Sequence, residues 1–288
     1  MELIILSSLE KIFADERPTA KPISAFSMLK NERTSFQAAF CCESNAFLSV
    51  SLSGGLAEYS KIYLVRDIPV GTACNKDADD YFLRKTSGMY PDVLEPIEGA
   101  VSAEGGKWYS VWVEISPEGK FTGGSELEIA FSADGETIAS GKVSVDVIDY
   151  NLNEQTLIHT CWYHSDCLCN YYNVEAMSDE YWRINRNFIR TAVEHGVNCI
   201  LTPVFTPPLD TAVGGERPTV QLVGVEKNGE SYSFDFSNFR KYIRLCLDCG
   251  IAAFEISHFF TQWGAKHAPK IMATVDGRLT RIFGWETT

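Results

Sequence analysis

The run Val197-Asn198-Cys199-Ile200-Leu201-Thr202-Pro203-Val204-Phe205 leads directly into Thr206-Pro207-Pro208-Leu209-Asp210, and Ala252-Ala253-Phe254-Glu255-Ile256 leads into a loop containing His258, Gln262 and Trp263. Both runs are apolar and of strand length, and both pass without a break into a polar loop. Loops that follow buried parallel strands carry the sites of α/β barrels. All five histidines and four of the six tryptophans lie beyond residue 150, so we expect any site in this half.

Amphipathic helices alternate with these strands. A first strand is predicted over 157–163, a helix from Ser178 to Gly196, and a second helix from Ser237 to Gly250. A hairpin over 220–226 and 231–236 precedes the second helix, with Asn228-Gly229 as a type I′ turn. This pattern predicts three βα units within residues 151–288 of a TIM-type (β/α)8 barrel. Because a closed barrel needs about 250 residues, we expect it to be truncated, with an open edge that favours self-association.

Residues 1–150 have a different pattern. Short runs with period-two alternation are separated by glycine pairs at 54–55, 105–106 and 123–124. No helical run longer than a turn or two interrupts them. We therefore predict an N-terminal antiparallel β-sandwich over 1–150 and a second domain over 151–288.

The charge of the chain is negative and unevenly distributed. Residues 1–150 carry 13 Lys+Arg and 23 Asp+Glu (13 − 23 = −10), and residues 151–288 carry 12 and 15 (12 − 15 = −3). An acidic chain argues against nucleic acid as a partner. No apolar run approaches the roughly 18 residues of a membrane span, so we also expect no membrane partner. The less charged second half suits a neutral ligand such as a sugar.

The amino terminus and the cysteines indicate a compartment. Met1-Glu2-Leu3-Ile4-Ile5-Leu6 lacks the basic region and cleavage pattern of a signal peptide and is interpreted as a strand. The nine cysteines are odd in number and lack the spacing of a disulfide framework. We expect a cytoplasmic protein.

Several polar and aromatic side chains of the second half are candidates for sugar binding. Glu255 and Asp166 are the acids placed to act near the ends of barrel strands. His258 suits a hydrogen bond to a hydroxyl, and Trp263 suits stacking on a pyranose. Their alternative roles are a buried ion pair with an arginine for Glu255, a cap for His258 and packing under the loop for Trp263. Trp162 and His164 occupy the equivalent end of the first strand.

The long loop after the second strand has its own candidates. Asp210 and Arg217 bracket it, and a bidentate pair that holds the loop is favoured over ligand contact. Gln221 contacts a ligand or lies on the hairpin surface. The full set of expected substrate-binding residues is Trp162, His164, Asp166, Asp210, Arg217, Gln221, Glu255, His258, Gln262 and Trp263.

The segment from His164 to Cys169 contains the ligand types of a zinc site. Its Cys-x-Cys step is shorter than the usual gap, and no second pair of ligands follows at a suitable distance. We therefore expect no metal and no cofactor.

Several longer motifs resemble a known group of proteins. They are 206–211, 215–222, 255–266 and 283–285 in the second half, and 31–37 and 90–94 in the first. The chain resembles bacterial glycoside hydrolase-like proteins that carry domain of unknown function 4091, relatives of glycoside hydrolase family 123. The resemblance covers nearly the whole chain and implies a β-sandwich followed by a (β/α)8 barrel.

The resemblance also implies a chemistry. Family 123 enzymes remove β-linked N-acetylgalactosamine with an Asp-Glu pair in a Ser-Asp-Glu-Pro-like context, and the acetamido group of the substrate is the nucleophile. No Ser-Asp-Glu-Pro occurs here, and the nearest match is Ser178-Asp179-Glu180-Tyr181, which opens a helix. We expect the catalytic pair beyond Thr288 and this chain to be inactive alone.

Two main functions remain open from the sequence, beside a third class, a metal-dependent hydrolase, that stoichiometric zinc in the purified protein would reveal. The first is a glycoside hydrolase-like protein that acts on β-linked N-acetylhexosaminides of an oligosaccharide or glycoconjugate, by substrate-assisted retention in its full-length form. The second is a non-catalytic carbohydrate-binding or scaffold protein.

Overall fold

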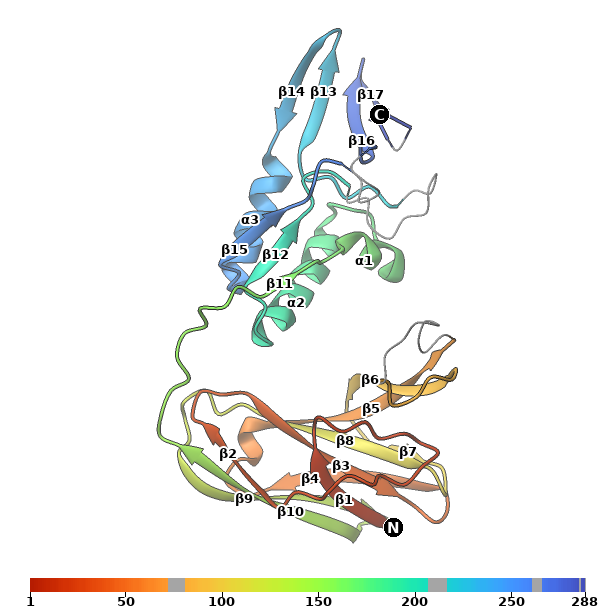
Figure 1. Ribbon diagram of the computed structural model, residues 1–288, viewed down its shortest axis with the longest axis vertical. Helices are drawn as coiled ribbons and strands as arrows, with labels where there is room; N and C mark the ends of the chain where they lie inside the picture. The colour runs from red at the N-terminus through yellow and green to blue at the C-terminus, as the bar shows by residue number, and fades with distance from the viewer. Residues whose placement is uncertain (72–80, 207–216, 261–265, 285, 288) are drawn as a thin grey trace. The chain divides into compact units, whose positions relative to one another are not determined.

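The computed structural model describes residues 1–288 except 72–80, 207–216, 261–265, 285 and 288. The chain divides into two compact units, Met1–Glu154 and Gln155–Thr288. The sequence placed the boundary after residue 150. The first unit is built of strands and the second combines strands with helices (Figure 1).

The first unit consists of two five-stranded sheets. One has the order β1-β3-β8-β5-β6 and the other β2-β10-β9-β4-β7. The strands are β1 (Glu2–Ser7), β2 (Ala25–Leu29), β3 (Thr34–Cys41), β4 (Ala46–Ser53), β5 (Ser60–Val70), β6 (Gly88–Pro96), β7 (Val101–Ala103), β8 (Trp108–Ile115), β9 (Gly123–Ala133) and β10 (Glu136–Ile148), with a 3₁₀ turn at Ala57–Tyr59. All pairs are antiparallel except β2 with β10, which is parallel and departs from the predicted antiparallel pattern.

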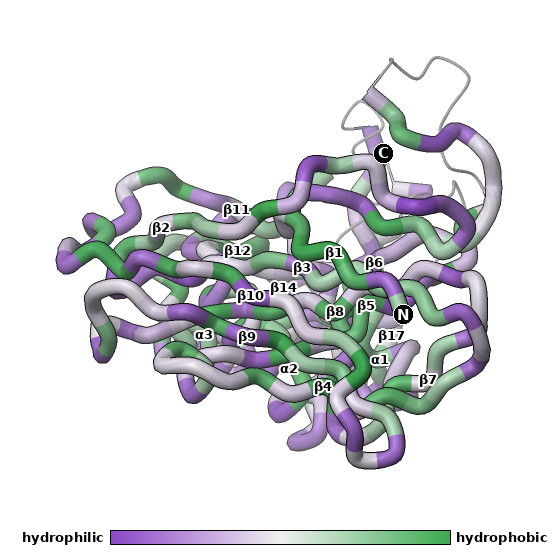
Figure 2. Tube along the Cα trace, turned by 90° about the horizontal axis from the view of Figure 1, so that it is seen from below, coloured by the Kyte–Doolittle hydropathy of each residue, from purple (hydrophilic) through white to green (hydrophobic). Residues whose placement is uncertain are grey.

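The apolar core of this unit lies between its two sheets. Phe36, Phe40 and Val111 from one sheet meet Ile129 and Phe131 from the other, and all five are fully buried. The tubes of β9 and β10 in Figure 2 change repeatedly between green and purple or white. This alternation has the period of a strand with one face in a core.

The second unit contains three parallel strands that are joined through helices. β11 (Thr160–Cys161), β12 (Cys199–Thr202) and β15 (Ala253–Ile256) form a sheet in that order. The first connection contains α1 (Ser165–Tyr172) and α2 (Asp179–Glu194), and the second contains α3 (Ser237–Cys249). Successive βα units are thus present, while the described strands do not form a closed barrel. The strand predicted over 157–163 is reduced to the two residues of β11 that pair with β12.

The second unit contains another sheet, whose strands lie in the segments that follow β12 and β15. Its order is β14-β13-β16-β17, with β13 (Gly224–Asn228), β14 (Ser231–Asp235), β16 (Ile271–Val275) and β17 (Arg278–Phe283). The hairpin β13–β14 was predicted, but its turn consists of Gly229 and Glu230, and of these only Gly229 has a positive φ (59°). A type I′ turn requires a positive φ at both residues, so this turn is closer to type II′. The β16–β17 hairpin was not predicted.

The helices α2 and α3 pack on the parallel sheet. Ser178 caps α2 by accepting a hydrogen bond from Tyr181 N at 3.2 Å, and α3 ends at Gly250, whose φ is 106°. Tyr181 and Tyr242 are fully buried between helices and sheet. The Tyr242 hydroxyl donates to the Leu201 carbonyl of β12 at 3.1 Å. The last contact ties α3 to β12, the strand that lies between β11 and β15.

Candidate functional site

Three predicted side chains meet at the carboxyl end of the parallel sheet. Trp162 follows β11, Glu255 lies in β15, and His258 follows β15. The Trp162 indole Nε1 donates to both carboxylate oxygens of Glu255, at 3.1 and 3.0 Å. The Trp162 and His258 rings lie 6.5 Å apart between centroids, with planes inclined at 43°. We call Trp162, Glu255 and His258 the strand-end cluster.

The strand-end cluster is accessible to a ligand. The Trp162 side chain is 53% exposed, His258 is exposed, and Glu255 is half-buried. Phe254, the neighbour of Glu255, packs on the other face of the sheet against the helices, as alternation along a strand requires. An exposed indole face can stack on a sugar ring, and a carboxylate can accept hydrogen bonds from hydroxyl groups. The side chains of the cluster are therefore suited to bind a neutral ligand that carries hydroxyl groups.

The second predicted acid, Asp166, lies in a different environment. Its side chain is 3% exposed, and Arg217 holds it through Nε to Oδ2 at 2.7 Å and Nη2 to Oδ1 at 3.1 Å. Arg217 Nη2 also donates to Cys167 Sγ at 3.4 Å, and the Arg217 carbonyl accepts from Lys270 Nζ at 3.3 Å. Arg217 was expected to pair with Asp210, which lies outside the described residues. Because a bidentate pair uses both carboxylate oxygens, Asp166 and Arg217 hold α1 against the β12–β13 connection.

His164 lies at the start of α1. It is half-buried, occupies the N-cap position, and accepts from Cys167 N through its carbonyl at 3.1 Å. Its side chain does not cap the helix. His164 is thus near Asp166 in sequence and is built into the same packed region.

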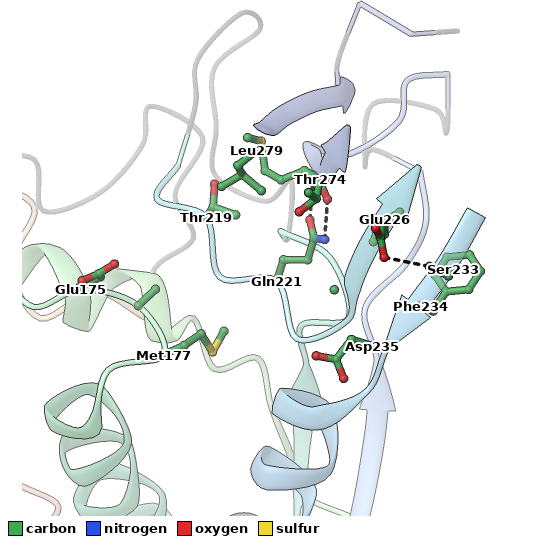
Figure 3. A pocket seen from close by; sticks show the side chains of 14 residues that line it. Glu175, Met177, Thr219, Gln221, Glu226, Ser233, Phe234, Asp235, Thr274 and Leu279 are labelled. Carbon is green, nitrogen blue, oxygen red and sulfur yellow. Dashed lines mark hydrogen bonds between the residues drawn. The ribbon is translucent and has the colours of Figure 1, made fainter. Parts of the chain in front are cut away.

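A pocket of about 840 Å³ lies on the connections that follow the parallel strands. Its lining comes from the α1–α2 loop, the β13–β14 hairpin with the segment before it, and the β16–β17 hairpin. Figure 3 shows the carboxylates of Glu175, Glu226 and Asp235 around this pocket. The Ser237 hydroxyl and backbone N–H lower the pKa of Asp235, so this carboxylate is ionised. The pocket is polar on these sides and apolar at Met177 and Leu279.

Gln221 lines this pocket, but its amide is already used. Its Nε2 donates to the Val223 carbonyl at 2.8 Å and to the Met272 carbonyl at 2.9 Å. Its Oε1 accepts from Met272 N at 2.9 Å, and Figure 3 draws the hydrogen bonds between Gln221 and Met272 as dashed lines. Gln221 therefore connects β16 to the segment before β13. The structure thus shows its amide clamping two backbone segments, and its contact with a ligand stays a prediction.

Sequence reasoning did not identify the pocket carboxylates. Glu226 and Ser233 are cross-strand partners, and their side chains lie 3.4 Å apart between Oε2 and Oγ. Period-two alternation along the predicted hairpin could have placed them on one face. Three other predicted residues, Asp210, Gln262 and Trp263, lie outside the described residues.

Metal ligands do not gather in the described part of the chain, where no group of three His, Cys, Asp or Glu side chains is close enough to hold an ion. In the His164–Cys169 segment, Cys167 is exposed and Cys169 is buried. Burial raises the pKa of the Cys169 thiol, which disfavours the thiolate that a metal requires.

Among the described residues, no helix is both long enough and apolar enough to span a membrane.

Comparison with known proteins relates the second unit to a family. Residues 162–287 match the family described as glycoside hydrolase 123, catalytic domain. No curated protein matches the chain. The strand-end cluster lies entirely within the matched residues.

Solved structures show the fold of nearly the whole chain. A family 123 glycoside hydrolase from Clostridium perfringens, studied for glycolipid glycan hydrolysis, superposes with a TM-score of 0.75 at 15% identity. The match covers 98% of this chain and 52% of that protein, so the chain spans about half its length. The N-terminal domain of PorA (TM-score 0.25, 7% identity, 51% of this chain and 97% of that chain) is too distant to support an inference.

The resemblance to glycoside hydrolase family 123 is thus confirmed, in sequence over residues 162–287 and in fold over nearly the whole chain.

Proposed function

We propose that this glycoside hydrolase-like protein binds a glycan at the strand-end cluster, with a terminal β-linked N-acetylhexosamine as the recognised sugar. The observation that carries the proposal is the Trp162–Glu255 contact at 3.0 and 3.1 Å beside His258. It lies at the carboxyl ends of parallel strands, where α/β barrels bind their substrates.

Each member of the cluster has a separate role in this proposal. Trp162 supplies the apolar surface on which the less polar face of the sugar stacks. Glu255 accepts hydrogen bonds from sugar hydroxyls, and the indole N–H keeps its carboxylate in place. His258 contacts a hydroxyl from the other side of the indole. Glu255 and His258 thus bind the hydroxyl groups of the sugar, and Trp162 binds its ring.

Hydrolysis by the family mechanism requires two further carboxyl groups. A substrate-assisted reaction needs one acid for the leaving oxygen and one carboxylate to orient the acetamido group. The 288 residues contain no Ser-Asp-Glu-Pro. The nearest sequence, Asp179-Glu180, lies in the first turn of α2, where Glu180 pairs with Arg183 at 2.6 Å. We therefore propose that this chain binds glycan without cleaving it, and that hydrolysis requires an Asp-Glu pair supplied outside these residues.

Binding of methyl β-N-acetylgalactosaminide to the 288-residue chain, measured by titration calorimetry, tests the proposal. Trp162→Ala and Glu255→Gln should each weaken binding about tenfold or more, because each removes a main contact. Matched controls are Tyr171→Ala, an exposed aromatic on α1, and Glu226→Gln, a carboxylate of the pocket; both should leave the affinity of the cluster unchanged. If the Trp162 and Glu255 variants bound the glycoside as tightly as the parent chain, the strand-end cluster would be excluded as the binding site.

A turnover assay tests separately the proposal that this chain does not cleave the glycan it binds. Incubation of the chain with 4-nitrophenyl β-N-acetylgalactosaminide should release no nitrophenol above the uncatalysed rate. Release that disappears in Glu255→Gln would show that Glu255 is itself catalytic and that the pair is not required.

A further inference from the structure

A groove of about 700 Å³ between α2 and α3 concentrates positive charge in a chain whose net charge is −13. Its lining contains Arg183, Arg186, Arg240, Lys241 and Arg244. These are five of the twelve Lys and Arg residues in 151–288, a part of the chain with a net charge of −3. An ordinary solvent-exposed surface carries interspersed positive and negative side chains. The clustering of positive side chains in this groove is therefore unusual.

Acidic neighbours compensate only part of this charge. Glu180 pairs with Arg183 at 2.6 Å, Asp248 lies 3.8 Å from Arg186, and Asp179 lies 3.9 Å from Lys241. The last two pairs bridge the helices, which lie side by side (Figure 1). Exposed pairs at these distances are weak and open readily to another anion.

Arg240 and Arg244 are the cations of the groove with the least acidic compensation, although the charges of Arg240 and Asp235 attract each other. Neither forms an ion pair with a residue that the structure describes, and the Arg240 guanidinium lies 6.0 Å from the centre of the Phe236 ring. They are four residues apart on one face of α3, at a spacing of about one helical turn, ~5.4 Å. Guanidinium groups bind planar oxyanions through two parallel hydrogen bonds. The two arginines therefore suit a ligand with successive anionic groups.

The groove lies between two helices that run antiparallel to the strands of the sheet. Only residues 195–198 separate the end of α2 from β12, and only 250–252 separate the end of α3 from β15. The carboxyl ends of both helices thus lie at the amino edge of the sheet, and their amino ends lie at the carboxyl edge. Asp179 and Lys241 mark that end of the groove. Phe254 faces α2 and α3, and its neighbour Glu255 faces the opposite side of the sheet, so the groove and the strand-end cluster are separate surfaces of this unit.

We propose that the groove between α2 and α3 binds an anionic glycan chain, with Arg240 and Arg244 paired to its sulfate or carboxylate groups. The choice of a glycan rests on the proposed function, and the choice of an anion rests on the groove alone. The strand-end cluster and the groove are then separate contact surfaces, and the groove favours glycans that carry negative charge.

The test is titration calorimetry of the whole chain with a chondroitin sulfate hexasaccharide at low ionic strength. Binding is expected, and it should weaken as salt is raised, because the contacts are exposed. Arg240→Ala with Arg244→Ala should weaken it by at least about tenfold, since two charged hydrogen-bonding groups are removed. Lys21→Ala with Lys61→Ala, which removes the same charge from exposed positions of the first unit, should change it little. Circular dichroism checks that both double variants keep their helices.

Three results would overturn the inference. The first is that the parent chain does not bind the hexasaccharide. The second is that the Arg240 and Arg244 double variant binds it as tightly as the parent does. The third is that a hexaglutamate peptide or a DNA hexamer binds the parent as tightly as the hexasaccharide, which would make the groove a general polyanion surface. Trp162→Ala separates the two proposals, because it should weaken methyl β-N-acetylgalactosaminide while leaving the salt-dependent binding of the hexasaccharide largely in place. Failure of one proposal thus does not imply failure of the other.

Discussion

Two carboxylates near the carboxyl ends of the parallel strands, Asp166 and Glu255, have opposite environments. Asp166 is 3% exposed, and one guanidinium group occupies both of its oxygens. Glu255 is half-buried and receives a single indole N–H beside an exposed imidazole. The first is buried in a charged pair, and the second remains accessible to a ligand. Position on the sheet is therefore a weaker guide to function than the burial of a carboxylate and the charge of its partner.

The strongest test of this contrast is Arg217→Ala. It leaves the buried Asp166 carboxylate without its counter-ion, and breaking a buried pair from one side costs about 3–5 kcal/mol. Urea unfolding should show this loss in the second unit. Arg183→Ala is the matched control, because its pair with Glu180 is exposed and should contribute less than about 1 kcal/mol. Equal effects of the two variants would remove the distinction between interior and surface pairs.

Alkaline pH tests the interior further. Burial raises the pKa of the Cys246 thiol from 9.0 to about 12, and burial also raises the pKa of the Tyr181 hydroxyl, which lies 2.9 Å from Ser165 Oγ. A thiol that ionises more readily in the unfolded chain contributes stability below pH 9 that is lost between about pH 9 and 12. The free energy of unfolding should fall by about 1.4 kcal/mol per pH unit for each such group.

Cys246→Ala shows whether this loss arises from the interior. The variant should lose stability at pH 7 from the smaller side chain, and its decline between pH 9 and 12 should be shallower than that of the parent. Cys167→Ala, at an exposed thiol, should leave the slope unchanged. The measurement is urea unfolding under reducing conditions across this range. Equal slopes in the Cys246 variant and the parent would show that the interior thiol already ionises in the folded chain.

The sequence predicted the elements with strong local signals. Ser178 and Gly250 mark the start of α2 and the end of α3, and alternation marked the strands of the first unit. The eight-residue α1 has only weak local signals, because the His164 side chain does not cap it and two of its aromatic residues, Tyr171 and Tyr172, are exposed. The β16–β17 hairpin had a usable signal in Asp276-Gly277, whose φ values of 48° and 76° form a type I′ turn.

Side-chain partners were harder to predict than elements. The sequence placed Trp162, Glu255 and His258 at strand ends, and the structure brings them together. It could not predict that Arg217 pairs with Asp166, because 51 positions separate them and the choice depends on how α1 packs. Gln221 shows the same limit, since its partner Met272 belongs to a hairpin that was not predicted.

The smallest effect on stability is expected at Glu255. Glu255→Gln keeps the shape of the side chain and an oxygen that can accept from the Trp162 indole, so unfolding should change by less than about 0.5 kcal/mol. The measurement is the urea midpoint beside that of Arg217→Ala. A loss above about 1.5 kcal/mol would mean that Glu255 is a structural residue like Asp166. Little change in stability together with weaker binding of methyl β-N-acetylgalactosaminide would instead show that this carboxylate is retained for its ligand, because the fold does not depend on its charge.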